Sequence, residues 1–463
     1  MKRIVLIFGA LFGLLLAARL CHVRVLWAEE TLPLAAAGEM HAGKTLYRDI
    51  WFDKPPGAAL VAWAVGGRDG VPPRVAGALY ALLCCWLAWG FARDPVVGGV
   101  GWGEHAGLWA AGLLGFFLVF DFPSAAIPLA SDLLMVAPHL GAVWMARRGR
   151  GWLAGALAGI AFLVSPKGVL VLAACLLWAP ALPLAGGFAA VTLGSVLWLG
   201  AAGALAAYWD EVWRWGRIYA GTTFLEHPLR EGLSRTANWA GFHAALVAGA
   251  WFGLKDDRRR WLMWIALGAI GVVAGLRFFP RYYLALLPPL VLLAARGMAA
   301  NPRRAACIGA LLIVPLARFA PTYVEAARGG WRDTAMDTDS RAVAAILRQE
   351  ARPGDTLFVW GYRPEIYVYS GLRAATRYLD SQPLTGVPAD RHLTQSAPVE
   401  TEQARARRGE LARSKPEWIV DGLGGYNPRL AIGAYPELRA WLKDYREAGR
   451  SASSVVYRRF GAE

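Results

Sequence analysis

Residues 1–20 read MKR-IVLIFGALFGLLLAARL, and this stretch decides the class of fold. The apolar run approaches the length of about 20 residues that an α-helix needs to cross a bilayer. It resembles a secretory signal peptide, but no small-residue cleavage site follows it, so we expect a retained first membrane helix. Similar apolar blocks recur along the chain, which predicts a polytopic membrane protein.

The composition agrees with this prediction. Hydrophobic residues make up 56% of the 463 positions and charged residues only 18%, whereas soluble proteins carry about a quarter charged residues. The net charge of +15 comes from Lys and Arg that lie mostly at the ends of apolar blocks and in the C-terminal region. No nucleic-acid recognition motif accompanies them, so we expect no nucleic-acid partner. All five cysteines lie in or beside apolar blocks, which favours neither a disulfide framework nor a Cys-based metal site.

The apolar blocks predict about eleven membrane helices in residues 1–320. After the first, they lie near 73–93, 104–121, 124–146, 151–165, 168–181, 184–207, 238–254, 261–277, 282–299 and 304–319. Ser165-Pro166-Lys167 splits two short blocks, which form either two short helices or one broken helix.

Basic loops predict the orientation of the chain. Lys2 and Arg3 place the N-terminus in the cytoplasm, and with eleven helices the basic turns at 147–150, 255–260 and 303–304 also fall inside. Residues 22–70, here called the first loop, and the C-terminal region then lie outside. Arg277 and Arg281 lie outside as well, against the usual charge bias.

Residues 321–463 are predicted to form a soluble α/β domain. Short apolar runs at 356–360 and 418–421 follow turn-forming residues and indicate buried strands, while 340–351 and 402–413 have helical spacing. We expect 380–402 to be loop. Trp360, Tyr362 and Asp421 are expected to be core and turn residues.

Two adjacent acids, Glu29 and Glu30, directly follow the first membrane helix. Acids at this position stabilise the N-terminus of a following helix. A carboxylate at the bilayer face is also suited to general-base catalysis. The residues alone leave both interpretations open.

The first loop carries, in order, Glu29-Glu30-Thr31, Glu39-Met40, Gly43, Tyr47 and Lys54-Pro55-Pro56. This order resembles the first periplasmic loop of family 39 glycosyltransferases, which include dolichyl-phosphate-mannose protein mannosyltransferases and bacterial lipid A aminoarabinose transferases. The resemblance implies a C-type fold, with a polytopic helical bundle, a catalytic first loop and an extracytoplasmic C-terminal domain. It also implies an inverting hexosyl or pentosyl transferase in the bacterial inner membrane. The enzyme would move a sugar from a polyprenyl phosphate to a lipid, glycan or protein acceptor.

The resemblance assigns roles to three acids. The family pair is Asp-Glu with the Asp catalytic, so Glu29 takes that role here, and Glu30 orients it or takes its place. Asp132 lies in the second outside loop, where family members often carry an acid near the acceptor or a metal. A helix N-cap is the equally weighted alternative for Asp132. The sequence assigns no metal ligands and does not require a divalent metal.

Four cations are candidates for binding the donor phosphate. The Lys-Pro-Pro element containing Lys54 contacts this phosphate in the resembling family, and Arg277, Arg281 and Lys167 lie at outer helix mouths. Interfacial snorkelling is the alternative for each. The aromatic residues at 208–219 indicate an interfacial belt, with sugar or prenyl stacking as the alternative.

A transporter or flippase of lipid-linked sugars is the rival interpretation. It predicts ionisable residues at mid-membrane and paired broken helices in two related halves. The charges instead lie at helix mouths, the halves show no symmetry, and the C-terminal region is sizeable. The sequence therefore favours the transferase.

The predicted orientation is tested by reporter fusions. Alkaline phosphatase fused after Gly330 should be active because that site lies outside, whereas fusion after Asp257 should be inactive. The reverse pattern would place the acids and the C-terminal region in the cytoplasm and contradict a donor presented at the outer face.

Overall fold

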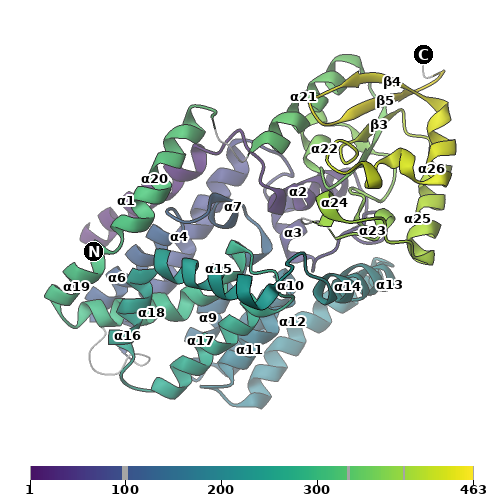
Figure 1. Ribbon diagram of the computed structural model, residues 1–463. Helices are drawn as coiled ribbons and strands as arrows, with labels where there is room; N and C mark the ends of the chain where they lie inside the picture. Colours follow the sequence, from purple (N-terminus) through teal and green to yellow (C-terminus); the bar gives the residue numbers. More distant parts are fainter. Residues whose placement is uncertain (1, 96–102, 331–333, 389–391, 462–463) are drawn as a thin grey trace.

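Helices dominate the N-terminal part of the chain, and a small sheet with its own helices forms the C-terminal part (Figure 1). The computed structural model describes residues 2–95, 103–330, 334–388 and 392–461. The mostly helical bundle and the C-terminal α/β domain are the elements that the sequence predicted.

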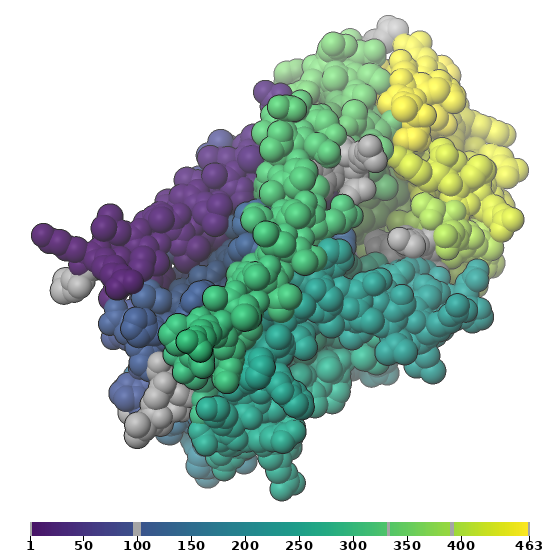
Figure 2. Space-filling view, turned by 60° about the vertical axis from the view of Figure 1, so that its left-hand side comes forward, coloured from purple at the N-terminus to yellow at the C-terminus, as the bar shows by residue number. Residues whose placement is uncertain are grey.

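Four described helical segments are long and apolar enough to cross a membrane. They are α1 (Lys2–Leu20), α4 (Val71–Arg93), α12 (Ala181–Ala201) and the run Pro280–Ala299, which joins η2 (Pro280–Leu286) to α18 (Leu287–Ala299). A fifth span results if α19 (Pro302–Ala310) and α20 (Ile313–Ala327), bent by 44°, are counted as one. Figure 2 shows these two helices as a continuous band of surface running from the bundle towards the C-terminal domain.

Each of the eleven predicted blocks contains helix, but several helices are shorter than a full span. These are α6 (Gly103–Phe117), α7 (Pro123–Ala126), α8 (Ser131–Leu134), α9 (Val136–Arg147), α10 (Gly151–Val164), α11 (Gly168–Cys175), α16 (Ala244–Gly253) and α17 (Arg258–Val273). The blocks on either side of Ser165-Pro166-Lys167 form two separate helices, α10 and α11. Proline disfavours helical backbone in the residue before it, which explains the break. The number of membrane crossings stays a prediction.

The outer face of α12 carries large apolar side chains that nothing in the described chain covers. Leu182, Leu193 and Leu197 are 84%, 59% and 73% exposed. A soluble protein rarely presents such a continuous apolar face to water. This exposure fits the predicted contact of the bundle with lipid.

Glycines allow two helix pairs to approach closely. A Cβ atom added at Gly187 of α12 would lie 1.9 Å from the carbonyl oxygen of Trp152, and one at Gly155 of α10 would lie 2.0 Å from that of Leu184. A Cβ atom added at Gly253 of α16 would lie 1.9 Å from the carbonyl oxygen of Leu293 in α18. Small residues at such positions let helix backbones pack directly against each other in membranes.

The first loop is more ordered than the sequence indicated, because it contains α2 (Ala28–His41) and α3 (Gly57–Ala64). Leu32 of α2 and Tyr47 share a hydrophobic core with Val343 and Leu357 of the C-terminal region. The two predicted domains therefore share a core through the first loop. In addition, α20 runs through the predicted boundary at residues 320 and 321.

Four further helical segments lie between α12 and α16 in the chain. They are α13 (Leu205–Tyr208), the π-helix η1 (Trp209–Arg214), α14 (Trp215–Gly221) and α15 (Pro228–Phe242). In Figure 1, α13 and α14 lie below the C-terminal domain.

The C-terminal sheet has five strands in the order β2-β1-β3-β5-β4. They are β1 (Thr356–Trp360), β2 (Arg373–Ala374), β3 (Trp418–Asp421), β4 (Tyr445–Arg450) and β5 (Val455–Arg459). β1 pairs in parallel with β2 and β3, and β5 pairs antiparallel with β3 and β4. Both predicted strands are confirmed as β1 and β3.

Helices surround this sheet. They are α21 (Ala335–Glu350), α22 (Glu365–Ser370), α23 (Gln382–Thr385), α24 (His392–Gln395), α25 (Glu402–Arg413) and α26 (Pro436–Trp441). The predicted helices are confirmed as α21 and α25. The predicted loop at 380–402 is corrected in part, since it contains the single-turn helices α23 and α24, and residues 389–391 lie outside the described residues.

The close approach of α10 and α12 generates a stability prediction. Gly187→Ala should lower the melting temperature in detergent, because the new methyl group would clash with the backbone of Trp152. Gly194→Ala is the matched control in the same helix, where a Cβ meets nothing within 4 Å. The control should leave the melting temperature unchanged or raise it slightly, because alanine favours helix over glycine. Equal melting temperatures for both variants would contradict the packing described.

Candidate active site

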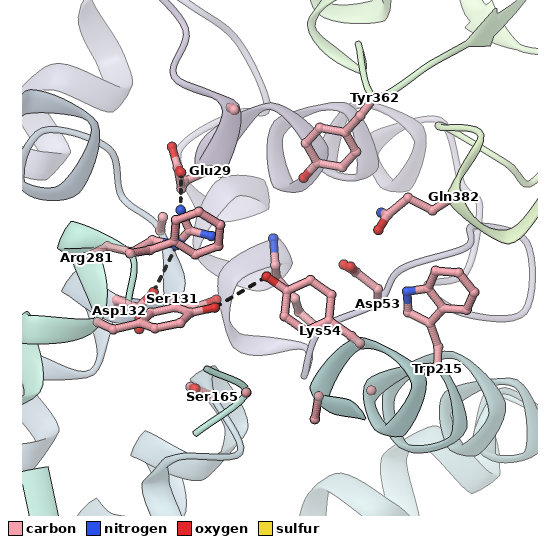
Figure 3. Close-up of a pocket in the computed structure, with 18 of the residues that line it drawn as sticks. Glu29, Asp53, Lys54, Ser131, Asp132, Ser165, Trp215, Arg281, Tyr362 and Gln382 are labelled. Atoms are coloured by element: carbon pink, nitrogen blue, oxygen red, sulfur yellow. Dashed lines mark hydrogen bonds and ion pairs between the residues drawn. The ribbon is translucent and has the colours of Figure 1, made fainter. Parts of the chain in front are cut away.

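A cavity of about 570 Å³ lies between the helical bundle and the C-terminal domain. The bundle contributes Asp132, Lys167 and Arg281, the first loop contributes Glu29, Asp53 and Lys54, and the C-terminal domain contributes Tyr362 and Gln382 (Figure 3). The cavity thus gathers ionisable side chains from segments far apart in the sequence. Five of the predicted site residues line it.

A chain of alternating charges runs along one side of the cavity. The Arg281 guanidinium lies 2.5 Å from a carboxylate oxygen of Glu29 and 3.5 Å from one of Asp132. Lys167 lies 3.5 Å from the other oxygen of Asp132, and its ammonium lies 3.3 Å from the centre of the Tyr282 ring. Arg281 is therefore the centre of the cluster and holds both carboxylates (Figure 3).

The helical geometry of α2 separates the two adjacent acids. Successive residues of an α-helix point about 100° apart, so Glu29 and Glu30 face different surroundings. Glu29 lines the cavity. Glu30 instead binds the buried Arg74 of α4 at 2.5 and 3.0 Å and accepts the backbone N–H of Trp27 at 3.0 Å.

Glu30 is therefore placed as a structural residue. Its side chain and that of Arg74 are almost completely excluded from solvent, and Glu30 is absent from the cavity lining. Acting from this position, it holds the first turn of α2 and with it Glu29. This geometry fits the orienting role expected for Glu30 rather than the alternative role as the base.

Lys54 extends into the cavity from the first loop (Figure 3). The Tyr47 hydroxyl donates a hydrogen bond of 2.7 Å to the Lys54 carbonyl, and Pro55 and Pro56 stiffen the following backbone. Within the described ranges of the chain, no ion pair to the Lys54 ammonium is found. This cation is thus available to an anion in the cavity.

Arg277 and Asp121 lie outside the cavity lining. Arg277 is fully buried, donates to the backbone of Tyr219 and to the Thr222 hydroxyl at 3.2 Å, and its guanidinium stacks 3.7 Å from the Tyr219 ring centre. It supports Tyr219, which does line the cavity. Asp121, a weaker candidate by sequence, lies 3.3 Å from the buried His243.

Several lining residues were missed or placed elsewhere by the sequence analysis. Tyr362 packs against two core clusters, as expected, and also lines the cavity. The sequence analysis did not predict Asp53 and Gln382 as site residues. Asp53 precedes the Lys-Pro-Pro element directly, which was an available signal. Trp215 and Tyr219 come from the aromatic stretch and line the cavity too.

Several of the residues that line the cavity carry a buried polar atom without a hydrogen-bond partner. A carboxylate oxygen of Glu29, one of Asp53, the Ser131 hydroxyl and the Lys167 ammonium are buried without a hydrogen bond. Buried polar atoms are normally satisfied, and exceptions often mark functional sites. Among the described residues, no group of three or more His, Cys, Asp or Glu is arranged to hold a metal ion.

Comparisons with known proteins identify the fold. No family model matches the chain, and no curated protein gives a significant sequence match. ArnT from Cupriavidus metallidurans, bound to undecaprenyl phosphate, superimposes with a TM-score of 0.61 and 14% identity, covering 100% of this chain and 99% of ArnT. Apo ArnT from the same organism gives a TM-score of 0.60 and 16% identity, covering 98% of each chain. The predicted C-type glycosyltransferase fold is thus confirmed over the full length.

The different surroundings of Glu29 and Glu30 predict unequal effects of their substitution on stability. Glu30→Gln should destabilise the protein by about 3–5 kcal/mol, because it leaves the buried Arg74 without its charged partner. Glu29→Gln, the adjacent isosteric control, should leave the melting temperature in detergent nearly unchanged, since Glu29 faces a cavity. A larger loss for Glu29→Gln would contradict the assignment.

Proposed function

We propose that the protein is an inverting glycosyltransferase that uses a polyprenyl-phosphate sugar as donor. The observation that carries this proposal is the cavity that Arg281, Lys54 and Lys167 line together with Glu29, whose carboxylate is paired with Arg281. The likeness to ArnT, which was solved with undecaprenyl phosphate bound, supports a lipid-phosphate ligand. The acceptor is a lipid, glycan or protein at the outer face of the bacterial inner membrane.

The three cations are proposed to bind the donor phosphate. Arg281 and Lys167 approach from the bundle and Lys54 from the first loop, so the phosphodiester is bound between two parts of the protein. Charge-assisted hydrogen bonds from Arg and Lys are stronger than neutral ones. They also stabilise the negative charge that develops on the phosphate as its bond to the sugar breaks.

Glu29 serves as the general base. It takes the proton of an acceptor hydroxyl, whose oxygen attacks the anomeric carbon of the donor sugar. The bond between this carbon and the phosphate oxygen breaks, and polyprenyl phosphate leaves with the bonding electrons. A single displacement inverts the configuration at the anomeric carbon.

Arg281 couples donor binding to the availability of Glu29 as the base. Its guanidinium lies 2.5 Å from Glu29, and a phosphodiester would compete with Glu29 for it. When the phosphate takes Arg281, both oxygens of Glu29 become available to the acceptor. Donor binding therefore precedes proton transfer.

The proposed orientation places this chemistry outside the cytoplasm. The cavity lies between the bundle and the C-terminal domain, which we place in the periplasm or outside the cell, with the N-terminus in the cytoplasm. Residues 1–320 form the membrane catalytic domain and residues 321–463 the extracytoplasmic domain. Nucleotide sugars are made in the cytoplasm and should not replace the lipid donor.

Glu29→Gln separates catalysis from donor binding. We expect transfer to fall by about 10²–10⁴-fold, because the general base is lost. The same variant should bind undecaprenyl phosphate about tenfold more tightly, because Arg281 loses its competitor. Transfer is measured by mass spectrometry of lipids and glycans from a deletion strain expressing each variant, and binding by calorimetry on purified protein in detergent.

Asp53→Asn is the matched control for charge, since it removes one negative charge from the same cavity without contacting Arg281. It should change the binding of undecaprenyl phosphate much less than Glu29→Gln. Lys54→Ala should weaken that binding. Wild-type transfer by Glu29→Gln would exclude Glu29 as the base, and transfer from a nucleotide sugar would exclude the lipid donor.

A further inference from the structure

The end of the cavity beyond Lys54 has a different chemical character from the charged side. Asp53, Trp215, Tyr362 and Gln382 line it, and Figure 3 shows them grouped on the opposite side of Lys54 from Glu29 and Arg281. They come from the first loop, the start of α14, the loop between β1 and α22, and the start of α23. The group combines an aromatic plane with short polar side chains.

Trp215 is held rigidly at this end. It is only 5% exposed, and its ring packs edge to face against the ring of Trp51, with centroids 5.9 Å apart. Its indole N–H is buried without a hydrogen-bond partner in the described chain. Figure 3 shows this nitrogen on the side of the ring that faces Asp53. A buried N–H without a partner is costly, and this one belongs to a residue of the cavity wall, which indicates a ligand that accepts a hydrogen bond.

Asp53 supplies the complementary acceptor. One of its carboxylate oxygens is also buried without a hydrogen bond. Behind it lies the buried Asp380, whose pKa is raised to about 7 mainly by burial and then by the charge of Asp53. Asp380 accepts the backbone N–H of Gln382 at 2.8 Å and its side-chain amide at 3.3 Å, which fixes Gln382 at the cavity wall.

This set of groups matches a ring that bears hydroxyls. Each sugar hydroxyl both donates and accepts hydrogen bonds, so it is satisfied by an acceptor such as Asp53 beside a donor such as Trp215. The Tyr362 hydroxyl both donates and accepts. The apolar face of a sugar ring packs on an aromatic plane, as ligand sites commonly combine apolar walls with a few placed polar groups.

We propose that this end, formed by Asp53, Trp215, Tyr362 and Gln382, binds the sugar ring of the lipid-linked donor. The inference rests on the proposed function, which places the donor phosphate at Lys54 and Arg281. The donor sugar is bonded directly to that phosphate, and Asp53 is the residue next to Lys54. A sugar attached to a phosphate at Lys54 therefore lies beside Asp53.

The test compares a sugar-loaded lipid with the bare lipid on purified full-length protein. The probes are undecaprenyl phosphate and undecaprenyl phosphate carrying glucose, mannose, galactose or arabinose, with affinities measured by calorimetry. For wild type, at least one loaded lipid should bind about tenfold more tightly than bare undecaprenyl phosphate. Trp215→Phe keeps the ring plane and removes the N–H, and Tyr362→Phe removes only a hydroxyl. Each should abolish most of this gain while the affinity for the bare lipid stays unchanged.

Trp213→Phe is the matched control, because Trp213 lies in the neighbouring π-helix and is absent from the cavity lining. It should keep the full gain. The assignment is overturned if wild type gains nothing from any loaded sugar, if both test variants keep the gain, or if they alter only the acceptor KM. Failure of wild type to bind even bare undecaprenyl phosphate would instead overturn the proposed function.

Discussion

The buried ion pair between Glu30 of α2 and Arg74 of α4 anchors the candidate site. It fixes the first turn of α2 to the bundle, with both side chains almost completely excluded from solvent. The far end of α2 is bound to the C-terminal domain, because Glu39 accepts the backbone N–H of Ala374 at 3.1 Å. α2 thus connects the two parts of the protein and places Glu29 at the cavity between them. A buried pair adds little net stability but is strongly destabilising to break, so it is well suited to holding one geometry.

Much of the fold was predictable from the sequence because the signals are local. Apolar length marks the bundle helices, and short apolar runs after turn formers mark β1 and β3. Of the two helices in the first loop, α2 was foreseen only as the helix that Glu29 and Glu30 would stabilise, and α3 was not predicted. Their apolar side chains pack with distant segments, as Leu32 shares a core cluster with Val343. A sequence pattern does not reveal that Tyr47 and Leu357 belong to one core. The parts of the fold that local sequence patterns did not predict are therefore those that depend on long-range packing.

The candidate site also contains residues that the sequence predicted and residues that it did not. Glu29 and Lys54 were identified through the family resemblance, and Asp132, Lys167 and Arg281 mainly from residue type and position near helix mouths. The cavity gathers all five. Arg277 satisfied the same criterion but turns into the protein and supports Tyr219. Charge at a helix mouth does not specify the direction of a side chain, so these two outcomes are indistinguishable in sequence. Tyr362 follows β1 and Gln382 begins α23, in a domain whose placement over the bundle only the folded structure shows.

The polar atoms left without hydrogen bonds explain why the cavity is arranged for a ligand rather than for stability. Natural proteins satisfy nearly all buried polar groups, and a local departure from this rule requires compensation elsewhere. Here the departures include Glu29, Asp53, Trp215 and Lys167, all on the cavity wall. The compensation lies just outside it, in the buried Glu30–Arg74 ion pair and in the shared core of the first loop. Because these supports hold the unsatisfied groups in place before a ligand arrives, little ordering remains to oppose binding, and their hydrogen bonds form with the ligand instead.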